Sequence, residues 1–251
     1  MSSKRIGIFC SGGDAPGMNA CVRGAVRTAT DLGHEVVGIM RGYQGLINRS
    51  FWRDPSGEEL LTSFRVASWA GHGSAHLRSS RSEEFRTPAG RQRAMQVLKE
   101  NQIDALIPIG GNGTIAGAIA LSEIWDGQIV ACPGTIDNDL YGTDYTIGFS
   151  TAVETAVEAV DRIRDTASSH DRMFLVEVMG HLQRGGVPTP EDRRRATQMG
   201  AGAINAIIAG KTGVMVGTAD DGTILTPLAE TIKAHRPVPN SLLKLLGQIQ
   251  L

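Results

Sequence analysis

The sequence lacks long apolar runs, and it has few cysteines. No run approaches the ~18 apolar residues that a membrane-spanning helix needs, so we expect no membrane contact. The apolar run after Lys4 and Arg5 is too short for the core of a signal peptide. The three cysteines are scattered without the spacing of a metal site or a disulfide framework, which fits a reducing compartment. We therefore predict a cytoplasmic location.

An excess of charge of either sign is also missing. The chain has 25 basic and 26 acidic side chains among 251 residues, with a net charge of −1. We therefore expect no nucleic acid as a partner, and any anion site must be local. Hydrophobic residues make up 41% and charged residues 20%, as in an ordinary globular protein of one large or two modest domains.

Glycine, by contrast, is abundant, since 31 glycines exceed the usual share of about 7%. The glycines stand in short clusters between apolar runs of strand length and helical patterns. We predict strands at residues 5–10, 35–40, 105–109, 128–132, 173–178 and 213–216. We predict helices at residues 19–32, 57–64, 87–101, 115–124, 151–166, 191–209 and 227–234.

Two of these helices have informative details. Thr87 before Pro88 is typical of an N-cap followed by proline at the first helical position. The helix at 151–166 gathers its apolar residues on one face, namely Val153, Ala156, Val157, Val160 and Ile163. The alternation of strands and helices predicts an α/β fold with a doubly wound, mostly parallel, Rossmann-like sheet. Ligands bind such sheets beyond the carboxyl ends of the strands.

Two glycine-rich segments lie where a strand passes into a helix. Ser11–Asn19 follows the first strand, and Gly110–Thr114 follows a later one. Backbone amides at such turns can approach a phosphate, and a helix N-terminus favours negative charge. Neither segment is a Walker A loop or a dinucleotide-binding G-x-G-x-x-G. Each alone fits a purely structural turn about as well, but two in one sheet favour a polyphosphate ligand.

The segment Pro133–Asp139 carries the clearest chemistry. Asp137 and Asp139 are two residues apart after a strand, and in an extended segment they would lie on the same side of the chain. One carboxylate can accept a proton from an attacking hydroxyl while the other holds magnesium or positions water. The alternative is an Asx-rich turn that caps the next element. Arginines near the glycines, Arg81 and Arg184 above all, can neutralise phosphates.

These segments together resemble the ATP-dependent 6-phosphofructokinase family of the bacterial type. Ser11–Asn19 resembles its first ATP loop, Gly110–Thr114 its G-G-D-G-S/T loop, and Pro133–Asp139 its P-G-T-I-D-N-D catalytic segment. Residues 141–148 continue this likeness, and residues 168–172 and 176–180 resemble the family's segment after the catalytic helix. His181–Gly186 is similar to the family's H-I-Q-R-G-G sugar-phosphate loop. The order and combination of these motifs are specific.

The resemblance implies a set of site residues. Asp137 would be the base for the sugar 1-hydroxyl, and Arg172 would reach a neighbouring subunit's site. The implied ATP-binding residues are Gly13, Arg81, Ser82, Gly111, Asn112, Gly113 and Thr114. The implied fructose 6-phosphate residues are Thr135, Ile136, Asp137, Arg172, Met179, Gly180, His181 and Arg184. Arg23, Arg27 and Arg164 match the family's allosteric nucleotide site.

The implied cofactor is Mg²⁺ with ATP as co-substrate, held by Asn112 or Asp139. Asn112 departs from the family's usual aspartate, which removes a negative charge from a hard-cation site. Gly113 and Gly134 stand where pyrophosphate-using relatives have Asp and Lys, and small residues leave room for ATP. The family also implies a homo-oligomer, a tetramer in the family.

A block of the family's second lobe has no counterpart here, because Gly180 runs directly into His181. We therefore expect a truncated second lobe. Residues 1–139 would form the ATP-binding α/β lobe, completed by about 181–236. Residues 140–180 would be the remnant of the sugar-phosphate-binding lobe, and 237–251 a C-terminal tail.

The expected activity is ATP-dependent phosphorylation of fructose 6-phosphate to fructose 1,6-bisphosphate in glycolysis. One alternative is a catalytically impaired or regulatory paralogue that binds nucleotide without turnover. Another is a different small-molecule kinase with a similar glycine loop, such as NAD kinase.

Overall fold

The computed structural model describes residues 3–169, 181–220, 222–233, 240 and 244. Within these residues, seven strands form one sheet in the order β3-β2-β1-β4-β5-β6-β7. The pairs from β2 to β6 are parallel, and the edge strands β3 and β7 are antiparallel. The strands are β1 (Arg5–Cys10), β2 (Glu35–Gly38), β3 (Leu60–Leu61), β4 (Ala105–Gly110), β5 (Gln128–Pro133), β6 (Val214–Ala219) and β7 (Gly222–Pro227).

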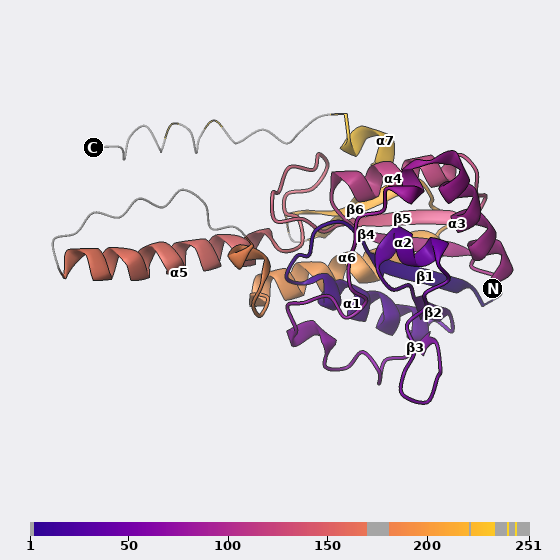
Figure 1. Cartoon of the computed structure of the whole chain (residues 1–251), viewed down its shortest axis with the longest axis horizontal. Helices are drawn as coiled ribbons and strands as arrows, with labels where there is room; N and C mark the ends of the chain where they lie inside the picture. Colours follow the sequence, from indigo (N-terminus) through magenta and orange to yellow (C-terminus); the bar gives the residue numbers. More distant parts are fainter. Residues whose placement is uncertain (1–2, 170–180, 221, 234–239, 241–243, 245–251) are drawn as a thin grey trace.

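Helices cover both faces of this sheet (Figure 1). One face packs against α1 and α6, and the other against α2, α3, α4 and α7. The helices are α1 (Met18–Asp31), α2 (Gly42–Ile47), α3 (Pro88–Glu100), α4 (Asn112–Ser122), α5 (Phe149–Ser168), α6 (Pro190–Ile208) and α7 (Leu228–Thr231). Short 3₁₀ turns are η1 (Trp69–Gly71), η2 (Glu84–Arg86) and η3 (Leu182–Arg184). The predicted α/β class and mostly parallel sheet are confirmed.

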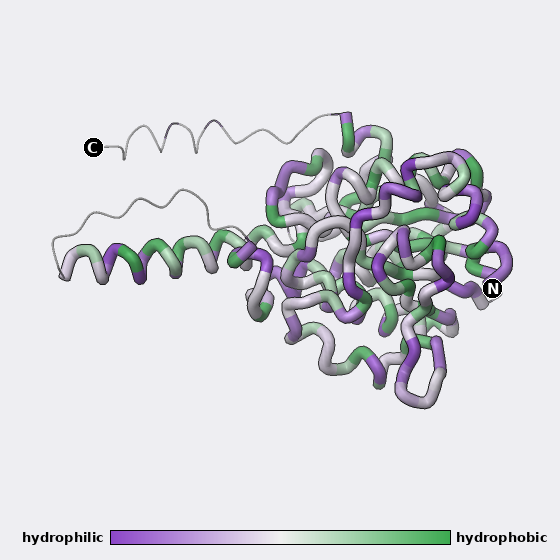
Figure 2. Tube along the Cα trace, viewed as in Figure 1, coloured by the Kyte–Doolittle hydropathy of each residue, from purple (hydrophilic) through white to green (hydrophobic). Residues whose placement is uncertain are grey.

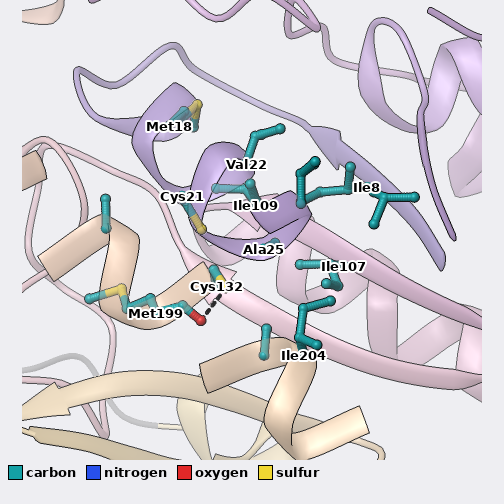
Figure 3. Packing of buried hydrophobic residues seen from close by; sticks show 14 of the residues in the cluster. Ile8, Met18, Cys21, Val22, Ala25, Ile107, Ile109, Cys132, Met199 and Ile204 are labelled. Carbon is teal, nitrogen blue, oxygen red and sulfur yellow. Dashed lines mark hydrogen bonds between the residues drawn. The ribbon is translucent and has the colours of Figure 1, made fainter. Parts of the chain in front are cut away.

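The packing of α1 on α6 depends on two glycines. A Cβ at Gly24 would lie 2.4 Å from the carbonyl oxygen of Thr197, and one at Gly200 would lie 2.1 Å from that of Cys21. The two helix backbones therefore approach closely, and α1 packs against β1 and β2 while α6 packs against β5 and β6. Figure 3 shows this layer, in which the Cys132 thiol donates a hydrogen bond to the Met199 carbonyl at 3.7 Å.

The cysteines belong to this same apolar layer. Cys10, Cys21 and Cys132 are free and buried. Burial raises the pKa of Cys10, and a hydrogen bond with Cys132, together with burial, raises the pKa of Cys21. These two thiols therefore stay protonated and pack as small apolar groups.

Several predicted elements are confirmed by position. β1 has the predicted bounds, and α3 begins where the proline signal placed it. The Thr87 hydroxyl accepts a hydrogen bond from the Gly90 amide at 3.0 Å, as an N-cap does. The predicted strand at 173–178 lies outside the described residues, and the lobe boundaries stay a prediction.

The helix predicted at residues 57–64 is wrong. Asp54 accepts hydrogen bonds from the amides of Ser56 and Glu58 at 2.8 and 3.0 Å, which closes an Asx turn. Gly57 has a φ of 92°, in the left-handed region. The chain therefore turns and returns as β3 along β2 instead of forming a helix.

α5 is the exception to the layered packing. Figure 1 shows it running away from the sheet along the long axis of the molecule. Of its residues, only Thr151 and Ala152 are buried.

No helix among the described residues combines the length and the apolar character that crossing a membrane requires.

Candidate active site at the strand ends

The two glycine-rich loops meet at the carboxyl ends of the neighbouring strands β1 and β4. The Thr114 hydroxyl donates to the carbonyl of Ser11 at 3.2 Å and so ties one loop to the other. A Cβ at Gly110 would lie 2.2 Å from the Thr114 hydroxyl and 2.5 Å from the Ser11 carbonyl. Only glycine at position 110 allows this approach, which brings two sets of backbone amides to one place.

A cavity of about 540 Å³ opens beside the two loops. Both loops line it, together with the start of the Pro133–Asp139 segment. Ten of the residues implied by the resemblance lie on its wall: Gly13, Arg81, Ser82, Gly111, Asn112, Gly113, Thr114, Thr135, Asp137 and Arg184. These ten come from five stretches of sequence that are separated along the chain, so the fold gathers the predicted groups around one space.

The Asp137 segment is bent, which corrects the expectation of an extended pair of carboxylates. Asn138 has a φ of 49°, a left-handed conformation that asparagine tolerates better than most residues. Its side-chain oxygen accepts from the Thr146 amide at 2.9 Å, and its amide donates to the Asp144 carbonyl at 3.3 Å. Asp137 and Asp139 therefore point to different partners.

Asp137 is exposed and lines the cavity. The Thr135 hydroxyl lies 3.4 Å from its carboxylate, and the Asp137 amide donates to that hydroxyl at 3.2 Å. Asp139 instead accepts a hydrogen bond from the side-chain amide of Asn112 at 2.7 Å. This contact joins the second glycine-rich loop to the catalytic segment, and it turns the Asn112 carbonyl oxygen away from Asp139.

Arg184 reaches back over the first loop. A Cβ at Gly13 would lie 2.1 Å from a guanidinium nitrogen of Arg184, so the side chain rests on this glycine. Burial raises the pKa of the nearby Asp14 carboxyl, whereas hydrogen bonds from the Ala75 and Ala15 amides and the charge of Arg184 act in the opposite direction. Arg184 of η3 thus joins Arg81, Arg86 and Arg91 as a cationic group of the cavity wall.

One wall of the cavity was missed by the sequence analysis. Tyr43 and Phe85 stack with ring centroids 4.0 Å apart, and the Tyr43 hydroxyl donates to the Thr114 carbonyl at 2.7 Å. Burial raises the pKa of Tyr43, so the hydroxyl stays protonated. A Cβ at Gly117 would lie 2.7 Å from the Tyr43 ring. The sequence contained one signal for this wall, the small residues Ala116, Gly117 and Ala120, which leave one face of α4 open to the cavity.

Other predicted residues lie elsewhere. His181 is exposed at the start of η3 and does not line the cavity. Ile136 is partly buried against the hydrophobic core and does not line the cavity. Arg172, Met179 and Gly180 lie outside the described residues.

The three arginines predicted for an allosteric site are not brought together. Arg23 donates to the Ala67 carbonyl at 3.3 Å, and Arg27 is exposed on the same helix, α1. Arg164 pairs with Asp161 at 3.1 Å near the far end of α5. Figure 1 shows that this end of α5 lies well away from α1. A site that joins them would need a second chain.

Comparison with known sequences identifies the relatives of this chain. The family model described as Phosphofructokinase matches residues 5–181. The ATP-dependent 6-phosphofructokinase 1 of Thermus thermophilus is 39% identical over 323 residues, covering 96% of this chain and 98% of the relative. The ATP-dependent 6-phosphofructokinase of Histophilus somni is 50% identical over 177 residues, covering 70% of this chain and 53% of the relative. These names give no support to a catalytically impaired paralogue.

The two kinds of match locate the missing block. An alignment of 323 residues exceeds the 251 of this chain, so a stretch of the Thermus relative has no counterpart here. The family match ends at residue 181, at the junction of Gly180 and His181. The match to the Histophilus relative covers about half of that relative's length.

Solved structures agree on the fold. The phosphofructokinase of Saccharomyces cerevisiae has a TM-score of 0.85 at 26% identity, covering 92% of this chain and 45% of that chain. A pyrophosphate-dependent phosphofructokinase of Marinobacter aquaeolei has a TM-score of 0.76 at 16% identity, covering 95% and 86%. The second likeness shows the fold alone.

Proposed function

Because the chain belongs to the phosphofructokinase family, we propose that it transfers the γ-phosphoryl group of ATP to the 1-hydroxyl of fructose 6-phosphate. The products are ADP and fructose 1,6-bisphosphate. One observation carries the proposal: both glycine-rich loops, Asp137 and four arginines line a single cavity. The gathering of phosphate-binding amides, a base and cations is what phosphoryl transfer requires.

The nucleotide binds along the two loops. Its phosphates accept hydrogen bonds from loop amides at the N-terminus of α4, where Gly111 is the N-cap. Arg81, which lines the same cavity, neutralises negative charge on the triphosphate. The flat Tyr43–Phe85 wall and the small residues of α4 leave an apolar recess for the base.

Asp137 acts as the general base. Its carboxylate accepts the proton of the sugar 1-hydroxyl while the oxygen attacks the γ-phosphorus and the bond to the ADP oxygen breaks. The Thr135 hydroxyl orients this carboxylate from one side. Catalysis is otherwise positioning and charge stabilisation, since the chemistry of the transferred group needs little from the protein.

Magnesium fits the donors of this site. Mg²⁺ is usually held by one or two carboxylates together with substrate phosphates. Asp139 supplies a carboxylate, whereas the Asn112 side chain donates to that carboxylate and would have to turn over to offer its uncharged carbonyl oxygen. When bound, the ion neutralises the charge that develops on the phosphate oxygens. Among the described residues no group of three or more His, Cys, Asp or Glu side chains gathers as a metal site, so the phosphates must complete the shell.

The sugar phosphate lies on the opposite side of Asp137 from the nucleotide. Arg184 and Thr135 face the cavity. The family resemblance adds His181, Ile136, Arg172, Met179 and Gly180, with Arg172 acting on a neighbouring subunit. The expected role of Arg172 at a neighbouring subunit, together with the separation of Arg164 from Arg23 and Arg27, favours a homo-oligomer. The scattered cysteines favour the cytoplasm.

A coupled assay tests the proposal. Purified chain is mixed with ATP, Mg²⁺ and fructose 6-phosphate, and ADP release is followed together with fructose 1,6-bisphosphate by mass spectrometry. We expect both products in equal amounts. ADP without the bisphosphate would show hydrolysis only, and the absence of both would contradict the assigned activity.

A further inference from the structure

Asn19 ends the first glycine-rich segment but takes no direct part in the proposed transfer. It is the second residue of α1, it is 0% exposed, and it does not line the cavity. Figure 2 shows the compact body of the molecule in which α1 lies. A buried carboxamide needs partners for its amide hydrogens and its carbonyl oxygen. The partners of Asn19 therefore show what this side chain holds in place.

The Asn19 side chain is hydrogen-bonded to one loop at three points. Its amide donates to the carbonyls of His72 and Ser74 at 2.8 and 2.7 Å, and its carbonyl oxygen accepts from the His76 amide at 2.8 Å. This loop, which we call the 72–81 loop, contains neither helix nor strand. One buried side chain thus satisfies backbone groups that no regular element satisfies.

The other end of the 72–81 loop lies on the first glycine-rich segment. The Gly12 amide donates to the Ser80 carbonyl at 3.3 Å, and the Ser80 hydroxyl donates to the Arg41 carbonyl at 2.8 Å. Arg81 comes directly after Ser80 and lines the cavity. The backbone position of Arg81 therefore depends on how the loop lies against its neighbours.

The middle of the loop has little freedom of its own. Leu77 is 0% exposed, and its carbonyl accepts from the Arg41 amide at 2.8 Å. Arg78 has a φ of 54°, in the left-handed region that a residue with a side chain keeps only where its surroundings hold it. Loss of the support at Asn19 would let this turn relax and carry Arg81 with it.

We propose that Asn19 is a positioning residue, which acts through the 72–81 loop to hold Arg81 where it meets the triphosphate. The inference rests on the proposed function, because that function supplies the triphosphate. A guanidinium that is already in place loses less freedom when it binds an anion, so the affinity is higher. Asn19 thus contributes to nucleotide affinity from outside the cavity.

A double-mutant cycle separates positioning from general stability. ATP affinity is measured by calorimetry in the presence of Mg²⁺. We expect Asn19→Ala to weaken ATP binding ~10-fold, and Arg81→Ala to weaken it at least as much. In the Arg81→Ala background, Asn19→Ala should have little further effect, because Asn19 acts through Arg81.

Two further variants complete the test. Asn19→Ser keeps one hydroxyl donor, so it should recover part of the lost affinity, and it is the milder variant if Asn19→Ala does not fold. Ile204→Ala leaves a cavity under α6 and lowers stability, but it should bind ATP like the parent chain. Unchanged ATP affinity in both Asn19 variants, or additive effects of Asn19→Ala and Arg81→Ala, would overturn the proposal.

Amide hydrogen exchange tests the loop without a ligand. The Gly12 and Arg41 amides both donate to carbonyls of the 72–81 loop, so they should exchange faster in the Asn19 variants but not in Ile204→Ala. If the parent chain binds no ATP, the proposed function is wrong, and exchange alone decides about Asn19. Unchanged exchange of these two amides would then show that Asn19 does not hold the loop.

Discussion

At the scale of single residues, the position of Asp137 on the cavity wall leads to a test of the catalytic base. We expect Asp137→Asn to lower kcat by ~10²–10⁴, because an amide cannot accept the hydroxyl proton. ATP binding should change little, since the loops and arginines are untouched. The measurements are ADP release and ATP titration. An unchanged kcat would contradict the assignment of Asp137.

Gly113 offers a second test, of the phosphoryl donor. A Cβ at Gly113 would meet nothing within 4 Å, so Gly113→Ala should be tolerated. Gly113→Asp instead places a carboxylate beside the expected phosphates, and we expect ATP affinity to fall at least tenfold. Gly134 differs, because its Cβ would lie 2.9 Å from Met18 and any side chain there disturbs packing.

The parent chain should use ATP and not pyrophosphate. The assay compares phosphorylation of fructose 6-phosphate with each donor at equal concentration. A pyrophosphate rate equal to the ATP rate would refute the interpretation of Gly113 and Gly134 as donor-selecting positions.

At the scale of elements, Asp192 of α6 joins this helix to the starts of α5 and α1. It is 1% exposed on α6, and it accepts hydrogen bonds from the Gly148 and Thr151 amides at 3.0 and 2.7 Å and from the Thr151 hydroxyl. It thereby satisfies amides at the start of α5. A Cβ at Gly17, at the start of α1, would lie 3.6 Å from the Asp192 Cβ.

We expect Asp192→Ala to lower the free energy of unfolding by ~2–5 kcal/mol, because two buried amides lose their acceptor. Asp192→Asn keeps one acceptor oxygen and should cost less. Denaturant unfolding measures both. If Asp192→Ala were as stable as the parent chain, the joint between α5 and α6 would have no role in stability.

At the scale of the whole molecule, the two ligands should not be affected equally by the missing block. Both glycine-rich loops and Asp137 precede residue 180 and are intact, whereas the block carries sugar-binding positions by family resemblance. Each charge-assisted hydrogen bond is worth ~1.5–3 kcal/mol. Without two of them, fructose 6-phosphate binding should be weaker by roughly two to four orders of magnitude while ATP binding survives.

Calorimetric titration of the chain with ATP and with fructose 6-phosphate measures these two affinities. Sub-millimolar binding of fructose 6-phosphate by a monodisperse chain would show that the missing block is not needed. Among the described residues, exposed large apolar side chains lie on α5, with Val153, Val157 and Val160, and on the edge strand β7, with Ile224 and Leu225.

The sequence by itself determined the elements whose signals are local. The buried run of β1 and the Thr87 cap of α3 depend on neighbours within a few residues, so pattern alone located them. The order of the motifs also fixed the family. Local signals failed at residues 57–64, where an Asx turn at Asp54 competed with the helix, and they gave no warning of α2 or β7.

Only the tertiary structure decided how the site is assembled. The left-handed bend at Asn138 sends Asp137 to the cavity and Asp139 to Asn112. The Tyr43–Phe85 wall and the reach of Arg184 over Gly13 join residues far apart along the chain. Such contacts depend on which strands lie side by side and how closely backbones approach. A one-dimensional pattern does not contain those distances, because they are set by the packing of the whole sheet and its helices.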